Sequence, residues 1–203
     1  MDFPALVQLK LELEFGVAPD GDRLPPARSN PEGHPRLIVS RYPGGVARFF
    51  RHDVPEETRR RLLALGPEQA FADEAAVRAI LEHDAPIANI WRVRWYVIER
   101  SPAAEEYPDV VLREGRHVIL VDGEIAARAR TDAESARAAE VGVETLPAYR
   151  RRGYARQVVA SWSAATLRQG KVAYYSHTVE NDGSAAVARS LGLTPLSEEV
   201  EYQ

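Results

Sequence analysis

A short segment with the pattern of a phosphate-binding turn lies between a predicted strand and a predicted helix. Residues 147–155 read Pro-Ala-Tyr-Arg-Arg-Arg-Gly-Tyr-Ala, follow the apolar stretch 141–146, and open an amphipathic segment that continues to Gln169. At such a turn the first amides of the helix carry a partial positive charge, and small residues let a phosphate approach the main chain. Arginine side chains add charge-assisted contacts. The segment therefore predicts a site for a diphosphate group.

The composition excludes several other kinds of chemistry. The formal charge of −4 gives no overall basic field, so we expect no nucleic-acid partner. The chain contains no cysteine, which excludes disulfides and thiolate nucleophiles. The five histidines show no helical ligand spacing, so no metal site is expected; they are His34, His52, His83, His117 and His177.

The sequence also carries no membrane or export signal. The start of the chain lacks the basic and apolar regions of a signal peptide, and no apolar run approaches the ~20 residues that span a bilayer. We therefore expect a cytoplasmic protein without a membrane partner. Lys10 and Lys171 are the only lysines against many arginines, which favours a GC-rich, bacterial genome.

Two groups of elements are predicted, separated by the proline-containing loop 101–108. The first group has a loop (16–36), a hairpin (36–42 and 46–51, around Pro43-Gly44-Gly45), helices at 55–66 and 67–83, and a strand at 87–99. The second has a hairpin (117–121 and 124–131), a strand (139–145), a helix (153–169), a strand (172–179), a helix from Asn181 to about Gly192, and a last strand (197–202).

The second group resembles a known family. The Arg-x-x-Gly-x-Ala pattern with Pro-x-Tyr before it is similar to the acyl-CoA motif of the GNAT superfamily of N-acetyltransferases. A second element of that family, Asn-x-x-Ser/Ala followed by Gly-Phe/Leu, is matched by Asn181, Ser184, Gly192 and Leu193. The resemblance covers residues 108–203. It implies an α+β fold with a mixed sheet: a GNAT acetyl-CoA-binding core at 108–203 and an N-terminal α/β extension at 1–107, on the acceptor side or completing the sheet.

The resemblance also assigns cofactor-binding residues for acetyl-CoA. In the family, the strand before the turn offers main-chain groups to the pantetheine arm, which implies Val143, Glu144 and Thr145 here. The amides of the turn hold the pyrophosphate, which implies Arg150, Arg151, Arg152, Gly153, Tyr154, Ala155 and Arg156. Asn181 caps a helix and, with Ser184, faces the pantetheine.

Catalytic residues are less well defined. Acetyl transfer needs a base for the amine and a proton for the departing thiolate. Glu140 is the first candidate for the base and Glu144 the second, because both lie on the strand before the turn. The family's usual acid is a tyrosine seven positions after the asparagine, and this position is Ala188 here. The possible substitutes are Ser184, Tyr174, Tyr175, Ser176, His177 or water.

The leading hypothesis is an N-acetyltransferase that moves an acetyl group from acetyl-CoA to a primary amine, of a small molecule or a peptide, by direct attack in a ternary complex. A homodimer is possible. The alternative is a GNAT-fold module that binds acyl-CoA or a partner without catalysis. A nucleotide-binding protein of another fold would need a Gly-Lys-Ser/Thr loop, which the sequence lacks.

Overall fold

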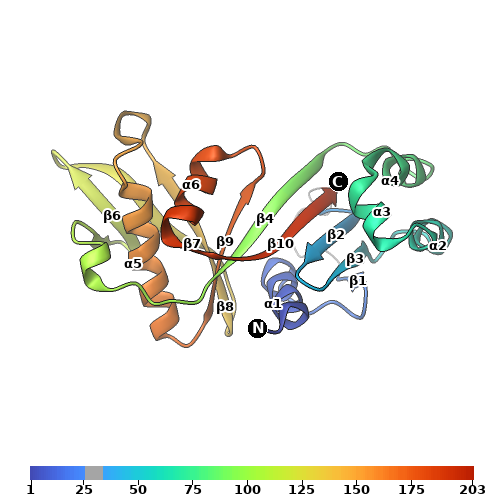
Figure 1. Ribbon diagram of the computed structural model, residues 1–203, viewed down its shortest axis with the longest axis horizontal. Helices are drawn as coiled ribbons and strands as arrows, with labels where there is room; N and C mark the ends of the chain where they lie inside the picture. Colours follow the sequence, from blue (N-terminus) through green and yellow to red (C-terminus); the bar gives the residue numbers. More distant parts are fainter. Residues whose placement is uncertain (26–33) are drawn as a thin grey trace. The chain divides into compact units, whose positions relative to one another are not determined.

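The computed structural model describes residues 1–25 and 34–203 (Figure 1). The chain forms two compact units, Met1–Trp95 with Leu196–Gln203, and Tyr96–Pro195. Strands β4 (Ile90–Ile98) and β10 (Thr194–Tyr202) each begin in one unit and end in the other. The units thus divide before the functional boundary proposed at 107/108, and residues 196–203 join the first. No helix in the described parts of the chain is long and apolar enough to span a membrane.

In its described residues, the first unit combines the strand order β1-β3-β2-β10-β4 with helices α1 to α4. Its elements are α1 (Phe3–Phe15), β1 (Arg23–Leu24), β2 (Leu37–Tyr42), β3 (Gly45–Arg51), α2 (Glu56–Ala64), α3 (Pro67–Ala72) and α4 (Glu74–Leu81). Leu37, Phe50, Leu62, Val77 and Val200 are among its fully buried core residues.

Three features of this unit correct the sequence-based prediction. Helix α1 was not predicted, although the side chain of Asp2 caps it and Gly16 ends it in a left-handed conformation. The predicted loop 16–36 contains β1, and its residues 26–33 lie outside the described part of the chain. The predicted helix 67–83 is two helices, because the side chain of Asp73 accepts a hydrogen bond from the amide of Ala76 and starts a new helix.

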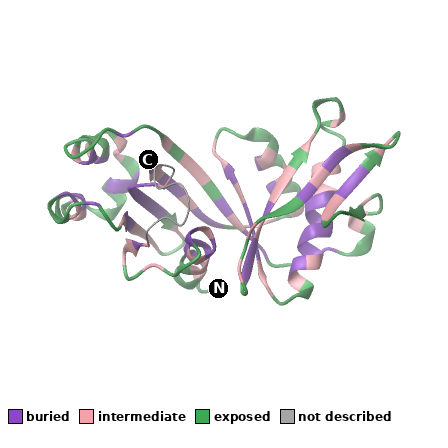
Figure 2. Ribbon diagram, turned by 180° about the vertical axis from the view of Figure 1, so that it is seen from behind, coloured by how far each residue is buried: buried purple, intermediate pink, exposed green. Residues whose placement is uncertain are grey.

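The second unit has the strand order β4-β9-β8-β7-β6-β5, with helices α5 and α6 on one face of the sheet (Figure 1). Its elements are η2 (Ala104–Glu106), β5 (Val111–Arg113), β6 (Arg116–Val121), β7 (Glu124–Glu134), β8 (Ala138–Thr145), η3 (Pro147–Tyr149), α5 (Tyr154–Arg168), β9 (Val172–Thr178) and α6 (Asp182–Leu191). Val158, Val159 and Trp162 of α5 pack on Ala139 and Val141 of β8, and Figure 2 shows this buried stretch of the helix. The order of elements from β6 onward agrees with the prediction.

Strands β8 and β9 separate soon after they begin. They pair in parallel through three positions, of which the last joins Glu140 to Tyr174. Beyond that point β8 pairs with β7 as far as Thr145, and the two strands diverge (Figure 1). A bulge at Asp132 of β7 accompanies this divergence, and bulges increase local twist. Residues 141–145 and 175–178 therefore face each other as free strand edges, which we call the splay.

Candidate active site

The turn between β8 and α5 presents a row of unused amides. Arg151 and Gly153 have φ values of 61° and 80°, and such left-handed residues turn successive N–H groups toward one side. No side chain caps α5 at Gly153. Within the described residues, no protein acceptor receives the main-chain N–H groups of residues 151–156. A Cβ placed on Gly153 would meet nothing within 4 Å, so the space in front of these amides is open.

The arginines of the turn divide into two groups. Arg150 Nε donates to Thr145 O at 3.3 Å and Arg152 donates to Ala148 O at 3.3 Å, and in the described structure neither these two nor Arg151 pairs with a carboxylate. Arg156 instead donates to the Glu106 carboxylate at 3.0 Å and to Ser190 O at 3.4 Å. The hydrogen bonds from Arg100 and from the Ala103 amide, with the charge of Arg156, lower the pKa of Glu106 to about 2. Unlike the other arginines of the turn, Arg156 therefore has a carboxylate partner, which it shares with Arg100.

The sides of the splay carry further unused polar groups. The hydroxyl of Thr145 is buried without a hydrogen-bond partner at the end of β8. Val143 packs against the core, so only its main chain is available. The Asn181 side-chain oxygen accepts from the Ser184 amide at 3.0 Å and caps α6. This leaves the Asn181 NH₂ group without an acceptor among the described residues.

Glu140 lies where β8 and β9 stop pairing. Ser176 Oγ of β9 donates to Glu140 Oε1 at 2.6 Å, so one hydrogen bond joins the two strands at the narrow end of the splay. Both side chains are half-buried. Glu144 differs, because its carboxylate lies 2.5 Å from Arg128 and its side chain is 54% exposed. Of the two predicted carboxylates, Glu140 thus lies at the narrow end of the splay, whereas Glu144, on β8 within the splay, is held in an exposed ion pair.

No hydroxyl extends from α6 at the usual position of the acid. Ala188 is 1% exposed and packs in the same cluster as Tyr175. The Tyr175 hydroxyl donates to Ser184 O at 3.2 Å, and burial raises its pKa. Tyr175 is also the first residue of β9 beyond the paired segment. Among the predicted substitutes, the structure therefore brings Tyr175 and Ser184 together at the first turn of α6.

The other candidates on β9 are placed differently. Tyr174 is fully buried, and Ser176 binds Glu140. His177 Nδ1 lies 2.7 Å from Thr178 O, which can only accept, so Nδ1 carries the proton. His177 Nε2 then accepts from the Tyr96 hydroxyl at 3.2 Å, and the two rings stack. No local sequence pattern indicates Tyr96, because this contact joins residues far apart in the chain.

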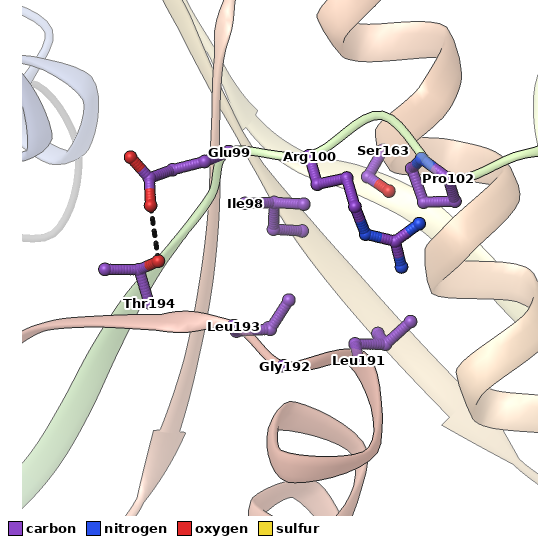
Figure 3. A pocket seen from close by; sticks show the side chains of 9 residues that line it. All are labelled: Ile98, Glu99, Arg100, Pro102, Ser163, Leu191, Gly192, Leu193 and Thr194. Carbon is purple, nitrogen blue, oxygen red and sulfur yellow. Dashed lines mark hydrogen bonds between the residues drawn. The ribbon is translucent and has the colours of Figure 1, made fainter.

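A cavity of about 180 Å³ lies at the opposite end of α6 from Asn181 (Figure 3). It is lined by Ile98, Glu99, Arg100, Pro102, Ser163, Leu191, Gly192, Leu193 and Thr194. Glu99 turns away from the cavity and accepts from Thr194 Oγ1 at 2.5 Å (Figure 3). The motif residues Gly192 and Leu193 thus end α6 and line this cavity, while Asn181 and Ser184 lie at the splay.

Comparisons with known proteins agree with this geometry. Residues 114–202 match the family model of GNAT acetyltransferases. A GNAT-family acetyltransferase from Colwellia psychrerythraea is 12% identical over 76% of this chain and 75% of that one, with a TM-score of 0.51. A GCN5-related N-acetyltransferase from Sphaerobacter thermophilus is 12% identical over 85% of this chain and 77% of that one, with a TM-score of 0.50.

A GNAT-family structure from Novosphingobium aromaticivorans is 20% identical over 57% of this chain, with a TM-score of 0.49, and the match spans 65% of its length. No curated protein matches the sequence. The solved structures show that the chain has a GNAT-type fold. Residues 114–202 are thus similar to the GNAT acetyltransferases, and the resemblance predicted from the sequence is confirmed.

Proposed function

We propose that this protein is an acetyl-CoA-dependent N-acetyltransferase with a primary amine as acceptor. The observation that supports the proposal most directly is the row of free amides at residues 151–156, which continues from the free edge of β8. An extended chain that ends in a diphosphate matches this arrangement. The main-chain groups along the edge of β8 can form hydrogen bonds with the pantetheine arm, and the amides at the start of α5 can donate to the pyrophosphate.

The residues around the splay divide the binding task. The main chain of Val143, Glu144 and Thr145 would pair with the pantetheine as an added strand would, and the Thr145 hydroxyl would gain a partner. The Asn181 NH₂ group would donate to a pantetheine carbonyl. The exposed guanidinium groups of Arg150, Arg151 and Arg152 would lie beside the phosphates, where positive charge without a protein counter-ion is most useful.

Glu140 is the proposed base. Its carboxylate takes a proton from the ammonium of the acceptor, and the neutral amine then attacks the thioester carbonyl carbon. The new C–N bond forms and the C–S bond breaks, so the products are an acetamide and the CoA thiolate. The hydrogen bond from Ser176 fixes the orientation of the Glu140 carboxylate.

The thiolate takes a proton from Tyr175 or from water. Burial keeps the Tyr175 hydroxyl protonated, as a donor requires, and it lies at the first turn of α6 beside Ser184. With Ala188 in the core, α6 has no phenol at the usual position. Tyr175 on β9 would therefore donate the proton that a tyrosine on the helix corresponding to α6 is expected to donate in other family members.

The binding site is tested by Gly153→Glu. The new carboxylate would fill the open space before the amides and repel the diphosphate, so calorimetry should show acetyl-CoA affinity reduced by at least about 100-fold. Gly170→Glu is the matched control, because Gly170 also has a positive φ (73°), also has nothing within 4 Å of an added Cβ, and follows the other end of α5. Equal affinities in the two variants would contradict the site.

The chemistry is tested by a screen of amines with detection of the free thiol. We expect turnover with at least one amine, and Glu140→Gln should reduce kcat by roughly 100-fold or more at neutral pH while acetyl-CoA affinity stays unchanged. The core position of Ala188 favours one alternative, a module that binds acyl-CoA without catalysis. Binding without turnover on any amine would support that alternative.

A further inference from the structure

Strand β5 forms one edge of the sheet in the second unit and exposes apolar side chains. It is the last strand in the order, and it pairs with β6 alone. Leu112 is 70% exposed and Val111 is 49% exposed, although both belong to a hydrogen-bonded strand. An edge strand with exposed apolar side chains is a surface suited to pairing with another strand.

The hairpin geometry shows which main-chain groups of β5 are free. Glu114 and Gly115 form its two-residue turn, with φ values of 52° and 72°. In such a hairpin the residues that close the turn, here Arg113 and Arg116, exchange both main-chain hydrogen bonds. The N–H and C=O groups of the preceding residue, Leu112, therefore point away from β6 toward solvent.

The charges along this edge are not balanced within the protein. Arg113 lies directly opposite Arg116, and like charges at such positions repel. Neither arginine pairs with a carboxylate in the described structure. Asp109, four residues before Arg113, is exposed, and within the described residues its side chain and amide form long hydrogen bonds of 3.4 Å with Gln157. Asp109 and Arg113, two positions to either side of Val111, thus carry opposite charges without an ion-pair partner among the described residues.

We propose that β5 pairs in antiparallel fashion with β5 of a second copy of this chain, with the two-fold axis at Val111. This register places Arg113 of each copy opposite Asp109 of the other, and Leu112 opposite Val110. Since the N–H of Val110 already donates to Tyr107 O, the Leu112 N–H of each copy donates to the Val110 carbonyl of the other. Both charges and both exposed apolar side chains gain partners in one symmetric contact.

The test is the molecular mass in solution by sedimentation equilibrium, up to roughly 100 µM chain, because an interface of one strand pair is small and its affinity modest. We expect about 45 kDa, twice the 22.6 kDa of the chain. Leu112→Asp should return the mass to that of the monomer. Val17→Asp is the control, because Val17 is also an exposed apolar residue (47%) but lies in the first unit.

The register is tested by exchanging the two charges. Arg113→Asp and Asp109→Arg should each raise the dissociation constant at least tenfold, because each places like charges together at both ends of the contact. The double variant should restore dimerisation, because the ion pairs form again with reversed sign. A monomeric wild-type protein, a dimer that Leu112→Asp leaves intact, or a double variant no better than the singles would each overturn the proposal.

Discussion

Two regions of the molecule concentrate charged and polar groups, but only one of them provides these groups with partners from the protein itself. In the first unit, Lys10 is completely buried, with its Nζ atom 2.5 Å from Glu199 and 2.6 Å from Glu14. Glu199 is also fully buried and accepts hydrogen bonds from Ser40 at 2.8 Å and from Ser197 at 3.2 Å. The ring of Trp95 covers the Lys10 ammonium at 4.4 Å. The buried ammonium of Lys10 and the buried carboxylate of Glu199 thus compensate each other within the protein.

In the second unit, the turn at residues 150–153 leaves its charged side chains without carboxylate partners. Three exposed arginines have no carboxylate partner in the described structure, and the amides of residues 151–153 have no acceptor there. The protein has carboxylates to spare, with a formal charge of −4, yet places none here. The comparison teaches that a buried charge needs a protein partner for the chain to fold, whereas an exposed and unmatched group of donors is best explained by a ligand that supplies the missing charge.

The largest predicted effect follows from breaking the closed cluster. Lys10→Met leaves the carboxylate of Glu199 buried without a cation, and such a loss should lower the free energy of unfolding by about 3–5 kcal/mol. Urea denaturation followed by tryptophan fluorescence would measure it. Lys171→Met is the control, because Lys171 makes a surface ion pair with Glu134 and should cost less than about 1 kcal/mol.

A second variant keeps the prediction testable even if Lys10→Met does not fold. Lys10→Met combined with Glu199→Met replaces the buried ion pair by apolar side chains, and it should recover most of the lost stability. If the single variant is as stable as the wild-type protein, the cluster is not structural and the comparison between the two regions fails.

A smaller effect is expected from the pH dependence of the same cluster. Burial and the nearby Glu201 and Glu199 carboxylates raise the pKa of Glu14 to about 8, against the opposing effect of Lys10. The carboxylates of Glu14, Glu199 and Glu201 in turn raise the pKa of Lys10, although burial alone would lower it. Because folded Glu14 keeps its proton where the unfolded chain releases it, stability should decrease as the pH rises from about 4.5 to 8.

The slope for one such proton cannot exceed about 1.4 kcal/mol per pH unit. Glu14→Gln is neutral in both states, so its free energy of unfolding should vary less over this range than that of the wild-type protein. Denaturation curves at several pH values would show the difference. A slope unchanged by the substitution would mean that another group titrates.

The sequence predicted one of these two regions and not the other. The turn is local: Pro147, Tyr149, Gly153 and the helix after them lie within a few residues, so their spacing alone indicates the structure. The Lys10 cluster joins residues 189 positions apart, and no local pattern reports such a contact. Helix α1 was missed for a related reason, since Leu9, Leu11, Leu13 and Phe15 alternate with polar residues instead of following a helical period.

The candidate site shows the same limit. Local spacing placed Glu140 and Glu144 on one face of a strand, but only tertiary structure pairs Glu144 with Arg128 and joins Glu140 to Ser176. The point at which β8 and β9 stop pairing also depends on the bulge in β7, which belongs to neither strand. The sequence therefore predicts the local structure of the turn better than the side-chain contacts of the two carboxylates.

The smallest predicted effect separates the amides of the turn from its side chains. Arg151 has a φ of 61°, a conformation that costs a non-glycine residue about 1–2 kcal/mol. Arg151→Gly removes this strain but gives the unfolded chain more freedom, so the free energy of unfolding should rise by no more than about 1 kcal/mol. Arg151→Ala keeps the strain and removes the same guanidinium, so it is the matched control. If the amides provide most of the binding, both variants should keep acetyl-CoA affinity within about threefold of wild type in calorimetry, because neither changes the main-chain donors. An equal and larger loss in both variants would assign the binding to the Arg151 side chain, and a loss in the glycine variant alone would show that the strained turn must be rigid to hold a phosphate.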